Sequence, residues 1–259
     1  MASSTSSIWD RPIPDLRNRL QACIDRGCDR LDRRTEVFFR ADDIAVPGRS
    51  FTELMALFSE FETPMALALV PAWLTKARWR KLEALGCKKP ELWSWHQHGW
   101  RHFNHEPAGK KSEFGPVRAD ADILHDLCLG RGRLKDLIGN LFFPVFTPPW
   151  NRCGPKTLRL LHELGFVAVS RGFDALPEAP AGLIELQVNV DLHTRKGKDG
   201  ASDRRILFRD IDSAIGSGRC GFMLHHQRMN GAAFDFLKIL LQVLADHPGV
   251  DVVGFNQLV

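Results

Sequence analysis

The chain has 259 residues, of which 44% are hydrophobic and 25% are charged, and its formal net charge at neutral pH is +4. This is an ordinary globular composition, and a chain of this length can bury a substantial core without disulfide or metal staples. The basic residues form only short clusters, without a long run or interleaved aromatic residues, which argues against nucleic-acid binding.

The cysteines and the N-terminal residues indicate the compartment. The six cysteines form no C-x-x-C pair and are expected to be free thiols in a reducing compartment. Residues 1–7 are polar and lack the apolar core of a secretory signal, and no apolar run approaches the ~20 residues that span a bilayer. We therefore expect a cytoplasmic protein without a membrane span, in which a flexible N-terminal segment, 1–14, precedes a single domain over 15–259.

Short apolar runs alternate with amphipathic stretches along the chain, and this alternation predicts an α/β fold. In chain order, helices are expected over 15–33, 50–61, 75–85, 118–138, 155–164, 203–215 and 232–244. Strands are expected at 37–41, 65–70, 92–96, 142–146, 167–170, 184–190 and 221–225. Most of these strands are almost continuously apolar, as in parallel strands that are covered on both faces. About seven parallel strands favour a closed or nearly closed (β/α) barrel over an open sheet.

Polar residues follow or end five of the predicted strands. In α/β barrels the active site is built at the carboxyl ends of the strands by the loops that follow them. We therefore expect these five clusters to converge in space. They are Asp42-Asp43, His98 with His102, Thr147-Pro148-Pro149-Trp150, Asp191 and His225-His226.

Four histidines lie within residues 96–105, and His98 and His102 are the best candidates for metal ligands. Their spacing of four would place both rings on one face of a helical turn. The same spacing occurs in zinc hydrolases with the H-E-x-x-H motif, in which three protein ligands leave one position open for water. His96 is expected to face the core or to support a ligand, and His105 to order the loop.

Asp42-Asp43 and His225 add the remaining chemistry. Two adjacent carboxylates point in different directions from an extended backbone, so one can bind a metal while the other faces the substrate. A histidine at the end of the last predicted strand can act as a general acid near neutral pH. Each feature has a structural alternative, because an Asp pair can cap a turn and a strand-end histidine can bond to the backbone.

In this combination the residues resemble the motifs of the polysaccharide deacetylases of the NodB-homology type, carbohydrate esterase family four and its relatives. The resemblance covers roughly residues 37 to 230, nearly the whole globular part of the chain. The matching segments are Arg40-Ala41-Asp42-Asp43, His98-Gly99-Trp100-Arg101-His102, Thr147-Pro148-Pro149-Trp150 and Phe222-Met223-Leu224-His225.

The resemblance implies a distorted, NodB-type (β/α) barrel that holds one divalent metal ion, most often zinc. Asp43, His98 and His102 would be the ligands of this ion. Asp42 would be the general base and His225 the general acid of an acyl-group hydrolysis.

The chain departs from the family pattern at three places. Thr147 stands where the family has the Arg that holds the catalytic base, and Arg171 is the candidate to supply that charge. Asp191 matches the Asp of the fourth motif, but the residues after it do not fit. Gly99 stands in place of the usual Ser or Thr after the first His.

Residues and resemblance together predict a metal-dependent hydrolase, acting on a non-peptide C–N bond, that removes an N-acyl group such as acetyl from an amino sugar or soluble glycan precursor. The substrate would be a small molecule or an oligosaccharide. Alternatives are an amide or formamide hydrolase with a non-sugar substrate, and a non-catalytic carbohydrate-binding barrel, which the missing Arg favours. Residues expected to bind substrate or to support the site are Trp150, Asp191, Arg171 and His226.

Overall fold

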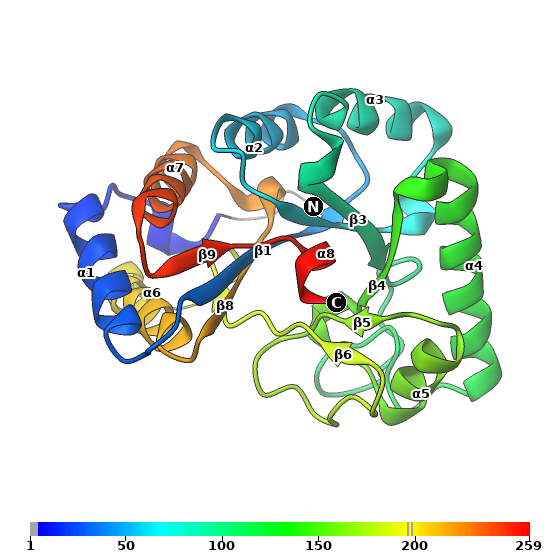
Figure 1. Ribbon diagram of the computed structural model, residues 1–259. Coiled ribbons are helices and arrows are strands. Elements are labelled where there is room, and N and C mark those ends of the chain that lie inside the picture. Colours follow the sequence, from blue (N-terminus) through cyan, green and yellow to red (C-terminus); the bar gives the residue numbers. More distant parts are fainter. Residues whose placement is uncertain (1–4, 196, 198) are drawn as a thin grey trace.

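The computed structural model describes residues 5–195, 197 and 199–259 of the chain. Its centre is a curled sheet of nine strands in the order β6-β5-β4-β3-β2-β1-β8-β7, and β9 pairs with β1 beside this path (Figure 1). All the strand pairs are parallel. The strands are β1 (Thr35–Ile44), β2 (Met65–Leu69), β3 (Trp93–His98), β4 (Phe142–Thr147), β5 (Ala168–Val169), β6 (Ile184–Glu185), β7 (Val190–Asp191), β8 (Arg219–Leu224) and β9 (Val250–Val252).

The sheet curls into the distorted barrel that the sequence predicts. The segment 184–191 supplies β6 at one end of the strand order and β7 at the other, so one irregular stretch runs from β5 to β8. Asn189 explains the break in the predicted strand, because both its backbone and its side chain bond to Gly221. The strand predicted over 184–190 is therefore two short strands, and β9 is a strand that the sequence pattern missed.

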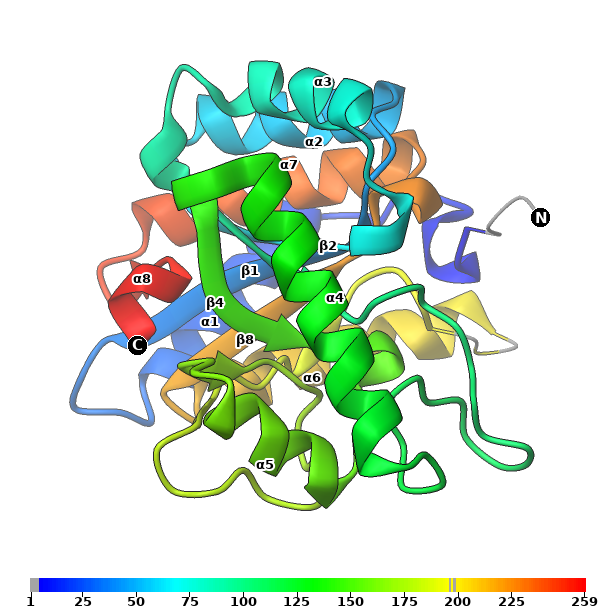
Figure 2. The ribbon, with the colours of Figure 1, turned by 90° about the vertical axis from the view of Figure 1, so that its right-hand side faces the viewer.

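The helices α1 to α7 pack around the outside of this sheet (Figures 1 and 2). They correspond to the seven predicted helices with shifted ends, and α8 is a short addition at the C-terminus. No described helix is both long and apolar enough to cross a lipid bilayer. The helices are α1 (Leu16–Cys28), α2 (Arg49–Glu60), α3 (Lys76–Gly86), α4 (Asp120–Ile138), α5 (Pro155–Glu163), α6 (Gly200–Ile215), α7 (Gly231–Asp246) and α8 (Phe255–Leu258).

Part of the N-terminal segment that the sequence predicts to be flexible packs against the domain. Ile8 and Trp9 lie in a short 3-10 helix and are buried in the core. The indole N–H of Trp9 donates to the carbonyl oxygen of Leu192 at 2.9 Å. Apolar burial and a satisfied indole N–H together hold this segment in place.

The two faces of β1 build two parts of the core. Phe39 faces the helices, where its ring stacks on Phe222 at 5.1 Å and meets the edge of Phe58 at 5.1 Å. Phe38 points the opposite way into the barrel, and its ring lies 5.6 Å from that of Phe255 in α8. Because α8 follows β9, which pairs with the first residues of β1, it covers the amino-terminal end of the barrel. Asp42, Asp43 and His98 lie at the opposite end of the barrel, where the strands end.

Candidate metal centre and active site

Residues from three strands meet at the carboxyl end of the barrel. Asp42 and Asp43 lie near the end of β1, His98 is the last residue of β3, and His225 directly follows β8. The sheet order places β8 beside β1 on one side, and on the other side only β2 separates β1 from β3. The strand ends of a parallel sheet meet at one edge, which is why these residues, distant in sequence, converge.

Asp43, His98 and His102 form a cluster with the chemistry of a metal site. One ligand atom from each lies within 4.8 Å of the others. Oδ1 of Asp43 is 3.3 Å from Nε2 of His98 and 3.2 Å from Nε2 of His102. This oxygen is buried and has no hydrogen-bond partner among the described residues. A buried, unpaired carboxylate oxygen facing two imidazole nitrogens fits a divalent cation with nitrogen and oxygen ligands.

The backbone orients one of the two imidazoles. Nδ1 of His98 donates to the carbonyl oxygen of Thr147 at 2.9 Å, so the proton of the neutral ring lies on Nδ1 and the lone pair on Nε2. Metal-binding histidines typically donate the N–H of the ring nitrogen that does not bind the metal in this way. Inside the barrel, the Thr147 hydroxyl lies 2.8 Å from Nε2 of the fully buried His96. His96 therefore faces the core, as one of its two sequence interpretations predicts.

A bulge in β1 separates the directions of the two aspartates. The pairing of β1 with β2 shifts register between Ala41 and Ile44, and Asp43 adopts a left-handed φ of 62°. A bulge re-aims the side chains of a strand locally. Asp43 therefore turns toward the histidines while Asp42 stays in the barrel interior.

The helical turn that the spacing of His98 and His102 suggests does not form. The strand β3 ends at His98, and the chain then makes an irregular turn in which Gly99 and His102 have φ values of 59° and 58°. The carboxylate of Glu113 accepts the backbone N–H groups of residues 100, 101 and 102 at 3.2, 2.7 and 3.2 Å. This tertiary contact replaces the helical hydrogen bonds that the spacing suggests. No motif in the sequence points to Glu113.

Arg40 holds Asp42 in a buried ion pair. Its Nε and Nη2 donate to Oδ1 and Oδ2 of Asp42 at 2.8 and 2.9 Å, and both residues are almost fully buried. Arg40 also donates to Ser170 Oγ at 2.8 Å and to Asn151 Oδ1 at 2.5 Å. Residues two apart on a strand share a face, so the spacing of Arg40 and Asp42 was the signal for this pair.

Arg171, the residue expected to supply this charge, lies elsewhere in the structure. Its Nε and Nη2 each donate to a carboxylate oxygen of Glu185 at 2.6 Å, which ties β6 to the end of β5. Arg171 therefore pairs within the irregular barrel segment, and the positive charge beside Asp42 comes from Arg40. Strand-end position alone does not tell which carboxylate an arginine reaches.

The structure places Asp191 in a turn after β7 and His226 against Phe51 of α2. The carboxylate of Asp191 accepts the backbone N–H groups of His193 and Thr194, both at 2.9 Å, and so closes a turn after β7. His226 is buried, and its ring meets the edge of the Phe51 ring at 5.3 Å. Neither has a described contact with the cluster of metal-type ligands.

His225 lies beside this cluster. Its Nε2 is 4.0 Å from Oδ2 of Asp43, and its backbone N–H donates to Nδ1 of the buried His193 at 3.1 Å. Within the described chain, Nδ1 of His225 has no hydrogen-bond partner. The side chain of Gln227, which the motifs did not single out, donates to the backbone oxygen of Asp43 at 2.8 Å.

The charges of the site shift the pKa values of its members. Burial raises the pKa of Asp42, but Arg40, His98 and His225 outweigh it and hold that pKa below the ordinary value. The three histidines outweigh burial in the same way and lower the pKa of Asp43. Burial lowers the pKa of His102 to about 4, with help from His98. His102 is therefore neutral at physiological pH, as a ligand must be.

Two tryptophans flank the cluster. The ring of Trp150 lies 4.4 Å from that of His102, and the ring of Trp73 lies 5.7 Å from it on a different segment. Trp73 is 37% exposed, and no sequence motif identified it. Trp150 has a left-handed φ of 56°, an uncommon conformation that marks a constrained turn. The two tryptophan rings therefore lie against His102 from different segments of the chain.

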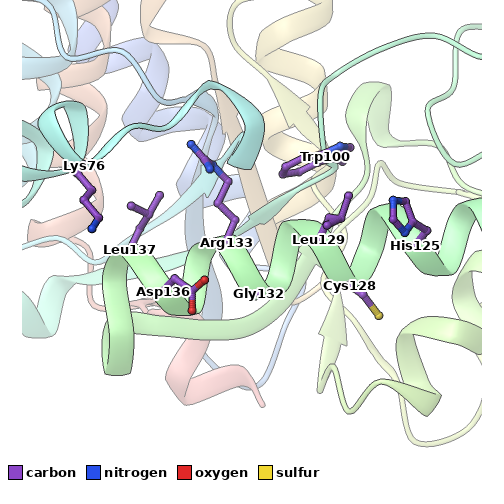
Figure 3. Close-up of a pocket in the computed structure, with 9 residues that line it drawn as sticks. All are labelled: Lys76, Trp100, His125, Cys128, Leu129, Gly132, Arg133, Asp136 and Leu137. Carbon is purple, nitrogen blue, oxygen red and sulfur yellow. The ribbon is translucent and has the colours of Figure 1, made fainter.

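A separate groove runs along the outer face of α4. Its volume is about 630 Å³, and none of the metal-type ligands lines it. Trp100, from the loop between His98 and His102, points into this groove above Leu129 and Arg133 (Figure 3). The loop therefore sends Trp100 outward onto α4 and His102 inward to the cluster.

No family model matches the sequence, and no curated protein is significantly similar to it. Solved structures do match. A protein from Mycobacterium smegmatis described as a polysaccharide deacetylase has a TM-score of 0.64 and 16% identity, over 88% of this chain and 90% of that chain. A family 4 acetyl xylan esterase from Clostridium thermocellum, solved with a cobalt ion, has a TM-score of 0.55 and 13% identity. The match covers 86% of this chain and 89% of that chain.

A CE4 family pseudoenzyme from Bacillus anthracis is similar as well. Its TM-score is 0.58 at 10% identity, over 88% of this chain and 66% of that chain. At these identities the likeness concerns the path of the backbone. The chain has the fold of the polysaccharide deacetylases and CE4 family esterases.

Proposed function

We propose that this protein is a metal-dependent hydrolase that removes an N-acyl group, first of all acetyl, from an amino sugar or a soluble glycan precursor. The observation that carries the proposal is the cluster of Asp43, His98 and His102, next to a second carboxylate that Arg40 keeps ionised. The fold shared with deacetylases and esterases, one of them solved with cobalt, supports it.

Asp43, His98 and His102 would hold the ion, and zinc suits a set of two imidazoles and one carboxylate. When bound, such an ion polarises an acyl carbonyl and lowers the pKa of water. Three protein ligands leave room for that water and the substrate oxygen.

The chain's own residues would move the protons. Asp42 is ionised because the charge of Arg40 outweighs the rise in pKa that burial causes. Its carboxylate would therefore accept the proton of the attacking water. Arg40 fixes both carboxylate oxygens and thereby the direction in which Asp42 presents its lone pairs. His225, whose Nε2 lies 4.0 Å from Oδ2 of Asp43, would donate a proton to the departing nitrogen.

The surroundings favour a substrate with an extended ring face. Trp73 and Trp150 come from different segments and flank His102. Sugar rings carry apolar C–H faces that pack on aromatic rings while their hydroxyls stay solvated. The tryptophans would hold the sugar while the acyl group reaches the cluster.

The substitution Asp42→Asn tests the division of roles. It keeps the shape of the side chain and the three ligands but removes the base, so acyl release should fall by about 10²- to 10⁴-fold while one equivalent of zinc still binds. The assay is acetate release from a panel of N-acetylated amino sugars and nucleotide sugars. Full activity of the variant would refute the role of Asp42.

A non-sugar amide or formamide would use the same residues. The acyl-release panel separates it when simple N-formyl and N-acetyl amines are included, because the better substrate identifies the class. If the sugars react poorly and the simple amides react well, the sugar assignment is wrong and the hydrolase assignment stands.

A non-catalytic carbohydrate-binding barrel is the second candidate. The missing Arg at Thr147, and a CE4 family pseudoenzyme with this fold, favour it. Against it stands Arg40, which restores the charge next to Asp42 from another position. Glycan binding without release of any acyl group by the zinc-loaded protein would establish this alternative.

A further inference from the structure

Glu113 is a buried carboxylate beside the loop that carries His102. It is 1% exposed and accepts three consecutive backbone N–H groups, those of Trp100, Arg101 and His102. Within the part of the chain that the structure describes, no cation pairs with its side chain. Burial of a carboxylate is unfavourable unless hydrogen bonds compensate for it, and here the backbone of one loop provides them.

The loop needs this support because its backbone is strained. His102 has a left-handed φ of 58°, which a residue with a side chain rarely adopts, whereas Gly99 adopts its φ of 59° without strain. Successive backbone N–H groups in such a turn form an anion-binding concavity called a nest, and the carboxylate of Glu113 is the anion that occupies it. The carboxylate therefore selects the one loop shape that turns His102 toward Asp43.

Gly99 and Glu113 are matched to each other. A Cβ atom at position 99 would lie 2.2 Å from Oε2 of Glu113 and 2.6 Å from Cγ of Pro149. The carboxylate thus occupies the space that a side chain at position 99 would fill. The departure from the resembled motif at Gly99 is explained by this contact.

Glu113 is itself held by a rigid part of the molecule. The carbonyl oxygen of Phe114 accepts the N–H of Gly154 at 2.8 Å and the hydroxyl of Thr157 at 2.9 Å, which fixes the segment to the start of α5. Nη1 of Arg118 donates to the carbonyl oxygen of Glu113 at 3.2 Å. The side chain can therefore transmit the position of α5 to the loop of His102.

We propose that Glu113 is a positioning residue that holds His102 in place as a metal ligand through the backbone of the loop. This inference rests on the metal site of the proposed function and deepens it. Glu113 is not one of the three candidate ligands, and its described bonds to the loop go to backbone N–H groups. It acts by fixing the loop before the ion binds, which lowers the ordering required on binding.

The test compares Glu113→Gln with the wild type and with Ser112→Ala. Glutamine keeps the size of the side chain but turns an NH₂ group toward N–H donors. Ser112 is the matched control because its hydroxyl donates to the carbonyl oxygen of Arg152 at 3.1 Å, and its bonds to Asn104 and His105 are made by the backbone, which alanine keeps. Zinc affinity is measured by titration calorimetry, and amide exchange by NMR on the metal-free protein.

We expect Glu113→Gln to bind zinc about 10- to 100-fold more weakly than the wild type. The amides of residues 100–102 should lose protection from exchange in this variant and keep it in Ser112→Ala. Wild-type zinc affinity in Glu113→Gln, or an equal loss in Ser112→Ala, would overturn the inference. So would unchanged protection of the three amides.

Acyl release by the zinc-loaded wild type is measured separately and distinguishes the two claims. If the wild type releases no acyl group but Glu113→Gln binds zinc more weakly, the proposed hydrolase is wrong and the role of Glu113 stands. If the wild type is active and the variant binds zinc normally, the opposite holds. A wild type that binds no zinc overturns both.

Discussion

Replacing Arg40 by Met is the most informative perturbation of this site. The substitution removes the guanidinium from a buried ion pair and leaves Asp42, which is 3% exposed, without its counter-charge. Breaking a buried pair by removing one partner costs about 3–5 kcal/mol. For a chain of this size each kcal/mol lowers Tm by about 2–4 °C, so Tm should fall by about 6–20 °C.

The double variant Arg40→Met with Asp42→Leu separates the ion pair from the loss of packing. Exchanging both charges for apolar side chains of similar size removes the uncompensated carboxylate, so it should be more stable than Arg40→Met alone. Ser170 and Asn151 still lose their hydrogen bonds from Arg40, so recovery is partial. The expected coupling between the two substitutions is about 1–3 kcal/mol, measured by urea unfolding.

The dependence of stability and activity on pH gives an independent test of the Arg40–Asp42 pair. In the wild type the folded-state pKa of Asp42 is lowered, so its ionisation stabilises the fold above the unfolded pKa of about 3.9, and this is lost as pH falls through the folded value. Without Arg40, only His98 and His225 oppose the effect of burial, so the folded-state pKa of Asp42 should rise and the stabilisation from its ionisation should shrink. The acid limb of kcat/KM for acyl release should move to higher pH in Arg40→Met.

Arg171→Met is the matched control. It breaks another buried arginine–carboxylate pair, with Glu185, and should lower Tm. It leaves Asp42 untouched and should not shift the acid limb. The reasoning fails if Arg40→Met is as stable as the wild type, if the two substitutions of the double variant are additive, or if Arg171→Met shifts the pH profile equally.

Three further outcomes are expected. Free zinc in excess over the protein, at about 100 times its Kd, should stabilise the fold by about 2.7 kcal/mol, and a chelator should reverse the rise in Tm; a Tm insensitive to both would exclude a metal site. Gly99→Ala should lower the free energy of unfolding, measured with urea, by at least about 1–2 kcal/mol, because the φ of residue 99 is 59° and the new Cβ would meet Glu113. A thiol reagent should label the exposed Cys87 and Cys128 in the native protein but not Cys220, because burial raises the pKa of the Cys220 thiol; native labelling of Cys220 would contradict the buried position.

The candidate ligands were predictable because residue type and strand ends are local properties. Asp43, His98 and His102 follow apolar runs that form strands by pattern alone, and parallel strands bring their ends to one edge. Their mutual contact required only that the order of the strands be that of a barrel.

The contacts of Arg40 and Glu113 could not be predicted from the sequence pattern. Arg40 shares a strand face with Asp42 by spacing, yet choosing it over Arg171 requires knowing how the segment 184–191 runs, because that path places Glu185 beside Arg171. Glu113 bonds to backbone N–H groups, which every residue possesses, so no side-chain pattern records the contact. The helical turn suggested by the spacing of His98 and His102 is absent for the same reason.

The sequence by itself determined the alternation of strands and helices, the barrel class and the residue types that meet at its carboxyl end. These depend on hydrophobic periodicity and on local chain direction, which are written along the chain. Only the tertiary structure decided which arginine neutralises Asp42, how the loop of His102 bends and which tryptophans flank it. Those outcomes depend on which buried charge and which backbone donor come within hydrogen-bond distance, and packing between distant segments sets that distance.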